Sequence, residues 1–204
     1  MEQEIKVFLF GLDKAGKTSL VKYLKEENVD ENQSPTREFD VIKLAIENQN
    51  FFIWDAPGQV KYREQWERGV LESDLLIFVL DTADIERYDE AKMELDIILN
   101  NSDTRGVPII VCFHKIDLEA AKENLNEAFK VLDLRDIKER KVNWLKTSVI
   151  SEEGIEDLEA MIYFSLILIE TQMNLDSVQK KYNDLEWEES NIFINYCIYL
   201  YRVL

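Results

Sequence analysis

The segment from Gly11 to Thr18 reads Gly-Leu-Asp-Lys-Ala-Gly-Lys-Thr and matches the pattern G-x-x-x-x-G-K-T. It directly follows a short β-rich apolar run, residues 5–10, and it opens a stretch with helical spacing, residues 17–27. The motif needs this order of strand, loop and helix, because glycines let backbone N–H groups wrap around phosphates and the helix N-terminus adds positive charge. A glycine-containing turn that binds nothing is the alternative, and the match of all four fixed positions of this eight-residue motif, in the right context, argues against it.

Two residues of this loop have predicted roles at a phosphate and a metal. Lys17 is expected to reach the β and γ phosphates of a nucleotide, and the Thr18 hydroxyl is expected to supply an oxygen to Mg²⁺. Lys14 is interpreted either as a cation near the β–γ bridge or as a lysine that faces solvent. The predicted nucleotide-binding positions of the loop are Gly11, Asp13, Lys14, Ala15, Gly16, Lys17, Thr18 and Ser19.

Runs of strand character alternate with segments of helical periodicity along the chain. The expected strands cover residues 5–10, 39–46, 51–54, 75–80, 108–113 and 142–145, and a hairpin turn is expected at residues 47–50. The expected helices cover residues 17–27, 86–100, 118–132 and 155–172. Continuous apolar strands between helices indicate an α/β fold with a mostly parallel sheet covered on both faces. Ligands bind such sheets at the carboxyl ends of the strands.

A second motif, Trp54-Asp55-Ala56-Pro57-Gly58-Gln59, follows the strand predicted at residues 51–54. Together with a phosphate loop that carries Asp at its third position, it resembles the small GTPases of the Arf and Sar type, whose second-switch motif is WDxGGQ. The resemblance covers residues 5 to 172. It implies a P-loop NTPase with a Ras-like G domain, built on a six-stranded, mostly parallel sheet.

The resemblance also implies roles for residues of the two switches. Asp55 would hold Mg²⁺ through a water, the Gly58 amide would meet the γ-phosphate, and Gln59 would orient the attacking water. Pro57 departs from the family pattern and lacks an N–H donor. Thr36 would be the first-switch threonine that closes on Mg²⁺ and the γ-phosphate.

The first switch differs from the family pattern in its neighbours. Ser34 competes with Thr36 for the role at the metal, and Phe39 three residues later favours Thr36. Arg37 and Glu38 stand where Ile-Gly is usual, which puts the family's sliding of the second and third strands in doubt. The catalytic residues implied by the resemblance are Gln59, Lys17 and Thr36.

The segment His114-Lys115-Ile116-Asp117 closes a predicted buried strand where GTPases carry N-K-x-D. Asp117 would accept hydrogen bonds from guanine N1 and N2, which adenine cannot donate, so the motif favours GTP over ATP. Rag GTPases are similar in carrying His at the first position, and His114 is taken as a residue near the base rather than a purely structural histidine. Ser148 and Val149 resemble the last guanine loop, whose backbone amide meets guanine O6.

Charge and cysteine usage exclude several classes of protein. The chain carries 24 Lys+Arg against 41 Asp+Glu, a net charge of −17, which disfavours nucleic acid polymers as partners. Cys112 and Cys197 have no companions at metal-ligand spacing, so a reducing, cytoplasmic location is expected. No apolar run reaches the length of a transmembrane helix, and Glu2 stands where N-myristoylation needs Gly. Any membrane contact is therefore expected to be peripheral and through partners.

The sequence predicts a G domain over residues 1–172 and a C-terminal extension over residues 173–204. An acidic stretch, residues 151–190, is followed by an apolar aromatic segment, residues 192–204. That segment is interpreted as an element folded back on the core, as a contact with a partner chain such as a dimer, or as a lipid contact.

These observations predict a GTP/GDP molecular switch that hydrolyses GTP slowly until an activating protein assists. An exchange factor and effector proteins are expected as further partners. Arg37, Arg63 and Arg68 are candidates for a cationic finger because they lie in or near the switches. The alternative is a GTP-binding scaffold or docking subunit with little hydrolysis, and a P-loop kinase fits the second-switch and base motifs poorly.

Overall fold

The structure is a computed structural model that describes residues 4–25, 36–46 and 49–165. Its centre is a six-stranded sheet with the strand order β2-β3-β1-β4-β5-β6. β2 and β3 pair antiparallel, and the other neighbouring strands pair parallel. The strands are β1 (Ile5–Phe10), β2 (Asp40–Ile46), β3 (Gln49–Asp55), β4 (Leu75–Asp81), β5 (Ile109–His114) and β6 (Val142–Thr147). The predicted mostly parallel sheet is confirmed.

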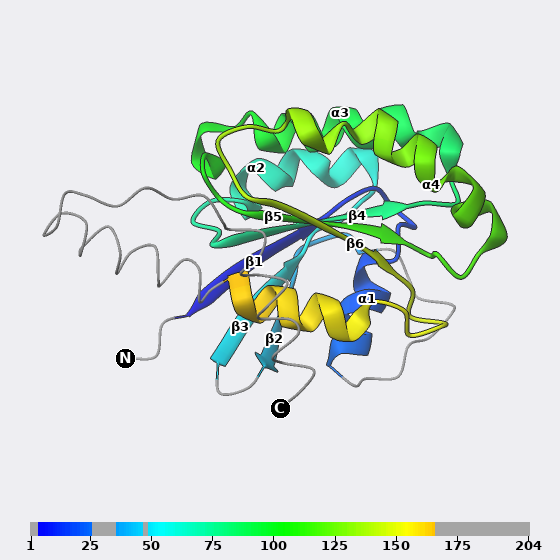
Figure 1. Ribbon diagram of the computed structural model, residues 1–204. Coiled ribbons are helices and arrows are strands. Elements are labelled where there is room, and N and C mark those ends of the chain that lie inside the picture. The colour runs from blue at the N-terminus through cyan, green and yellow to red at the C-terminus, as the bar shows by residue number, and fades with distance from the viewer. Residues whose placement is uncertain (1–3, 26–35, 47–48, 166–204) are drawn as a thin grey trace, which may run out of the picture. The chain divides into compact units, whose positions relative to one another are not determined.

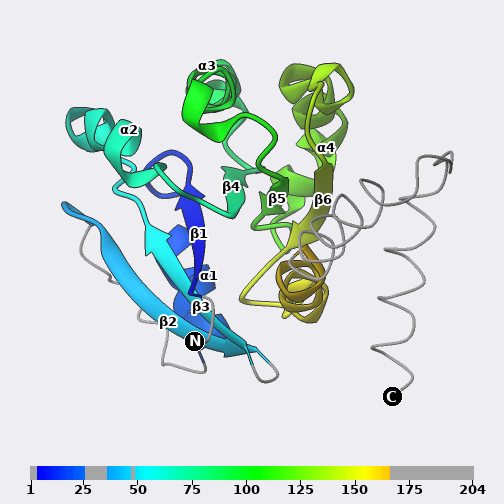
Figure 2. The same cartoon turned by 90° about the vertical axis from the view of Figure 1, so that its left-hand side faces the viewer.

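Helices cover both faces of this sheet. α2, α3 and α4 lie along one face, and α1 lies on the opposite face (Figures 1 and 2). Their bounds are α1 (Lys17–Leu24), α2 (Trp66–Gly69), α3 (Tyr88–Leu99) and α4 (Glu119–Leu132). The chain divides into two compact units, residues 1–155 and 156–204, and of the second the structure describes the helical residues 156–165. Among the helices of the described ranges, none is long and apolar enough to cross a membrane.

Two local expectations were wrong in detail. Gln49 and Asn50 extend β3 instead of forming the turn, because they pair with Ile46 and Ala45 and so satisfy the backbone ladder at half-buried positions. The segment 60–69, for which no element was predicted, forms a 3₁₀-helix (Val60–Gln65) and then α2. Ser34 and residues 173–204, with Cys197, lie outside the described residues.

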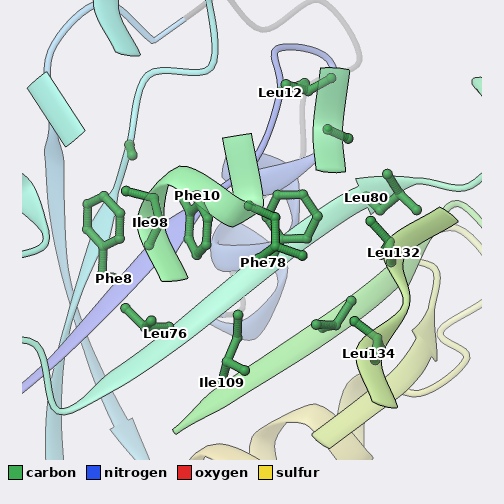
Figure 3. Close-up of a cluster of buried hydrophobic side chains, with 14 of the residues drawn as sticks. Phe8, Phe10, Leu12, Leu76, Phe78, Leu80, Ile98, Ile109, Leu132 and Leu134 are labelled. Atoms are coloured by element: carbon green, nitrogen blue, oxygen red, sulfur yellow. The ribbon is translucent and has the colours of Figure 1, made fainter. Parts of the chain in front are cut away.

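The main hydrophobic core lies between the sheet and α2, α3 and α4. Alternate residues of one strand point to the same face, so β1 supplies Phe8 and Phe10 to this core and β4 supplies Leu76, Phe78 and Leu80 (Figure 3). β4 and β5 are buried on both faces, which explains their uninterrupted apolar sequences. Phe10 also packs edge-on against Trp66, with ring centroids 5.6 Å apart, and this contact anchors α2.

The sheet register brings the ends of the functional segments together. Leu9 of β1 pairs with Asp55, so the phosphate loop begins beside the end of β3. His114 at the end of β5 pairs with Asp81 on one side and with Thr147 on the other. The two sequence motifs and the guanine motif therefore lie at the carboxyl edge of one sheet, where doubly wound folds bind their ligands.

Gly69 leaves room for an aromatic ring. A Cβ at Gly69 would lie 2.3 Å from Phe39 Cζ and 2.8 Å from Phe8 Cε2. The Phe39 ring, which precedes β2, thereby packs against α2 and against Trp54, at a centroid distance of 5.7 Å. A side chain at position 69 would displace this ring.

We expect Gly69→Ala to lower the free energy of unfolding by about 1–3 kcal/mol, through overpacking against Phe39. At a solvent-exposed helix position the same change would stabilise the protein by about 1 kcal/mol, so the sign of the effect distinguishes overpacking from helix propensity. Urea unfolding measures it. A double variant with Phe39→Leu should recover part of the loss, and a stabilised Gly69→Ala would contradict the packing described above.

Candidate functional site

The phosphate loop adopts backbone conformations that explain its glycines. Gly11 has φ 141°, and a Cβ there would lie 2.3 Å from Val79 O, so only glycine fits. Gly16 has φ 95° and lies against the His114 ring, at 2.5 Å between its virtual Cβ and Cδ2. Lys14 is exposed and also adopts the left-handed region, with φ 63°, which costs a non-glycine residue roughly 1–2 kcal/mol.

Lys17 begins α1 with its ammonium buried beneath the loop. Its Nζ donates a hydrogen bond to Leu12 O at 2.9 Å. Burial lowers the pKa of Lys17 to about 8, and the nearby Asp55 and Asp13 carboxylates oppose that shift. An ammonium removed from water in this way gains strongly from an anion placed beside it.

Three oxygen-bearing side chains meet at the N-terminus of α1. The Thr18 hydroxyl donates to Asp55 Oδ2, and the Oγ1 atoms of Thr18 and Thr36 lie 3.1 Å apart. Asp55 is fully buried, and burial raises the pKa of its carboxyl. Its Oδ1 has no hydrogen-bond partner among the described residues. A buried, under-satisfied carboxylate beside two hydroxyls fits a hard divalent cation such as Mg²⁺.

The second switch packs directly on the phosphate loop. Gly58 O accepts hydrogen bonds from Asp13 N at 3.1 Å and from Arg63 Nε at 2.7 Å. A Cβ at Gly58 would lie 2.4 Å from Asp13 N, so this approach requires glycine. Pro57 O accepts from Trp66 Nε1 at 2.8 Å. The segment is thus held by its carbonyls, and the missing Pro57 N–H leaves this set of bonds intact.

Gln59 follows this packed segment in an extended conformation, with φ −67° and ψ 136°. It is partly exposed, and within the described ranges its side chain makes no hydrogen bond, while its carbonyl accepts from Tyr62 N at 2.9 Å. The Gln59 backbone is therefore held by a hydrogen bond, and its side-chain amide is open to a ligand or water.

The three candidate arginines differ in their surroundings. Arg63 is buried and forms ion pairs with Glu94 at 2.9 Å and Glu90 at 2.7 Å, both on α3. Arg37 and Arg68 are exposed and have no ion-pair partner in the described part of the chain. The roles of Glu90 and Glu94 were missed by sequence reasoning. Their i, i+4 spacing was the available signal, because it places two carboxylates on one side of the helix.

The base motif is braced by residues that flank it. Ser148 Oγ donates to Asp117 Oδ1 at 2.6 Å and so orients the carboxylate. The Ser148 amide donates to Glu153 O at 2.9 Å, whereas the Val149 amide makes no hydrogen bond within the described residues. Lys115 Nζ pairs with Asp81 Oδ2 at 2.6 Å, a contact that sequence reasoning also missed.

His114 joins the phosphate loop to the last guanine loop. Its ring lies against Gly16, and its Nδ1 hydrogen bonds with Thr147 Oγ1 at 2.9 Å. Burial lowers the pKa of His114 to about 4; Lys115 lowers it further, and Asp81 and Asp117 oppose the shift. The imidazole is therefore neutral near pH 7, with one nitrogen donating and one accepting.

Comparison with known proteins gives consistent results. Residues 1–165 match the model of the ADP-ribosylation factor family. ADP-ribosylation factor-like protein 3 of Chlamydomonas reinhardtii is 37% identical over 68% of this chain and 77% of its own. ADP-ribosylation factor-like protein 3 of Caenorhabditis elegans is 35% identical over 76% of this chain and 84% of its own.

A solved structure supports the fold. The Arl6 BBS3 small GTPase of Trypanosoma brucei, with a bound nucleotide analogue GppNp, superposes with a TM-score of 0.68. The match covers 76% of this chain and 92% of that one, at 24% sequence identity. At this identity the likeness concerns the arrangement of strands and helices, which is the Ras-like G-domain fold.

The lowered pKa of His114 predicts a pH-dependent stability. As the pH falls below about 6.5, the unfolded chain takes up this proton before the folded one, so stability is complete above that pH and is lost toward pH 4. Between about pH 7 and about pH 5 the loss should be about 2 kcal/mol.

Urea unfolding of the wild type and of His114→Asn at both pH values checks this. His114 is the only histidine of the chain, so subtraction of the two profiles removes the carboxylate contributions. An identical pH dependence in both proteins would show that the imidazole is not buried in its neutral form.

Proposed function

The chain belongs to the ADP-ribosylation factor family of small GTPases, and from this premise we propose how its own residues carry out the family's reaction. It is a GTP-binding molecular switch that hydrolyses GTP. The observation that carries the proposed site is the meeting of Thr18, Thr36 and Asp55 at the start of α1, beside the buried Lys17 ammonium.

We propose that Mg²⁺ is held by the hydroxyls of Thr18 and Thr36, with Asp55 acting through a water. The under-satisfied Asp55 carboxylate supports this assignment, because a bound cation supplies the charge that the buried group lacks. The metal would neutralise charge on the phosphates. Thr36 is proposed for this role because its hydroxyl lies 3.1 Å from that of Thr18.

The phosphates are proposed to be bound by the Lys17 side chain and by backbone amides of the loop from Gly11 to Ser19. These amides include those of Asp13, Lys14, Ala15 and Gly16. The Asp13 amide donates to Gly58 O at 3.1 Å, so a phosphate oxygen that accepts from this amide would have to displace Gly58 O. The Gly58 amide is proposed to meet the γ-phosphate. Gln59 is proposed to orient the attacking water with its open side-chain amide.

Asp117 is proposed to recognise guanine, with Ser148 holding the carboxylate in place and the Val149 amide facing O6. This choice between the two amides is supported by the bond of Ser148 N to Glu153 O. His114, as in the Rag-like motif, would brace Gly16 of the phosphate loop against Thr147 near the base. Lys115 would lie along the base while it remains paired with Asp81.

Hydrolysis is proposed to be slow without an activating protein. Arg63, the buried arginine of the second switch, is committed to two carboxylates of α3, which leaves charge on the transferring phosphoryl group less neutralised. An exchange factor and effectors would complete the cycle. The G domain is proposed to extend over residues 1–172. Residues 173–204 are proposed to contact a partner protein or a second copy of this chain. The protein is proposed to act in the cytoplasm, either free or at the periphery of a membrane.

Lys14 is proposed to place its ammonium near the β–γ bridge. It is exposed on the loop, and no described residue pairs with it. Lys14→Ala should then lower single-turnover hydrolysis about tenfold through lost charge stabilisation. Lys122→Ala, which removes an exposed lysine of α4, is the control. If both variants hydrolyse GTP like the wild type, Lys14 is only a solvent-facing residue.

The proposed mechanism is tested by binding and hydrolysis measured separately. With Mg²⁺ present, the chain should bind GTP and GDP and reject ATP, since adenine lacks the N1 and N2 donors that Asp117 would accept from guanine. Gln59→Leu should keep GTP affinity while single-turnover phosphate release falls by about tenfold or more.

Equal phosphate release from wild type and Gln59→Leu would remove Gln59 from the mechanism. Nucleotide binding with negligible release from the wild type would instead support the scaffold reading. Calorimetric titration at matched Mg²⁺ concentration supplies the affinities.

A further inference from the structure

We propose that Arg63 is a positioning residue that holds the Gly58–Gln59 peptide in place, and that Glu90 and Glu94 of α3 anchor it. The inference rests on the proposed role of Gln59 in orienting water. It assigns Arg63 to an internal function instead of the cationic finger that its place in the second switch suggested.

The peptide bond between Gly58 and Gln59 is gripped at its oxygen from two sides. Arg63 Nε donates to Gly58 O at 2.7 Å, and Asp13 N donates to the same oxygen at 3.1 Å. Because the peptide unit is planar, fixing its oxygen also fixes the direction of the Gln59 N–H and the position of the Gln59 Cα. Displacement of Arg63 would remove one of the two hydrogen bonds that restrain this peptide.

Arg63 is itself restrained by charge. Its Nη1 pairs with Glu94 Oε1 at 2.9 Å and its Nη2 with Glu90 Oε1 at 2.7 Å, while Asp13 Oδ1 lies 3.6 Å from Nη2. The side chains of Arg63, Glu94 and Glu90 are 5%, 13% and 31% exposed. Burial makes such pairs costly to break, because the charges left behind are poorly solvated. Arg63 therefore cannot turn toward the phosphates without leaving Glu94 unpaired and giving up its ion pair with Glu90, which would keep its pair with Arg87.

The same anchor extends to the phosphate loop through a second arginine. Arg87 donates to Asp13 Oδ1 at 2.9 Å and to Asp13 O at 3.2 Å, and its Nε donates to Glu90 Oε2 at 2.8 Å. Glu90 thus bridges Arg87 and Arg63. Asp13 and Arg63, the two residues that donate to Gly58 O, are therefore both connected to Glu90 of α3, Arg63 directly and Asp13 through Arg87.

This arrangement acts on the geometry of the reaction more than on nucleotide binding. Among the described residues, Glu94 pairs with Arg63 and with no residue of the phosphate loop, so its loss would loosen the peptide that precedes Gln59 while Arg87 still holds Asp13. A shift of about 1 Å in a catalytic group can cost up to about a hundredfold in rate. Loosening the anchor should therefore lower the hydrolysis rate and leave affinity nearly unchanged.

Glu94→Gln tests the proposal, because it keeps the side-chain shape and removes one charge from Arg63. We expect single-turnover GTP hydrolysis to fall about fivefold, with GTP and GDP affinities within about twofold of wild type. Glu86→Gln is the matched control, since Glu86 is exposed and has no partner among the described residues. Glu90→Gln is a second variant, and thermal unfolding verifies that each protein is folded.

The same substitution in the Gln59→Leu background separates positioning from general damage. If Arg63 acts through Gln59, Glu94→Gln should have almost no further effect there, because the group it positions is gone. An equal fall in both backgrounds, or hydrolysis equal to that of Glu86→Gln, would overturn the inference. Gln59→Leu with wild-type hydrolysis would instead refute the proposed role of Gln59, so the two failures are distinguishable.

Discussion

The parallel pairing of β1 with β3 is the contact on which the site depends. Because Leu9 lies opposite Asp55, the chain leaves β1 into the phosphate loop just where β3 delivers the buried carboxylate. Thr18, the second residue of α1, then donates to Asp55, and Ala56 N donates to Leu9 O at 2.9 Å. A slip of one residue in this register would turn Asp55 to the other face of the sheet and separate it from Thr18.

Buried charge explains how this edge of the sheet is both stable and receptive to a ligand. Lys17 and Asp55 are both buried, and each is shifted toward its neutral form by loss of solvent. Among the residues that the structure describes, Lys17 Nζ has only the Leu12 carbonyl as a hydrogen-bond partner, and Asp55 Oδ1 has no partner. Such groups are costly in an empty site and favourable beside phosphate and a divalent cation, so nucleotide binding and folding stability are linked here.

Sequence reasoning located the parts of the site that local motifs define. The phosphate loop, Asp55 and Asp117 could be placed because each follows an apolar strand, and parallel strands end at a common edge. The anchor of Arg63 could not, since Glu90 and Glu94 look like ordinary solvated residues of α3 until the second switch is folded against them. The role of Gly69 could not be placed either, because its lack of a side chain matters only once the Phe39 ring, distant in the sequence, packs against it.

Catalysis of this reaction has two requirements, orientation of the attacking water and neutralisation of charge on the phosphoryl group, and Arg63 can serve only the first. Orienting a water needs a rigid backbone before Gln59, and the Arg63 network is suited to supply that rigidity. Neutralising the transferring phosphoryl group beyond what Lys17 and Mg²⁺ would supply needs a further cation that reaches the phosphates, which an arginine held by Glu90 and Glu94 cannot also provide. The same ion pairs that favour a positioned water thus withhold charge from the transition state, and this is the physical reason to expect that a partner completes the site.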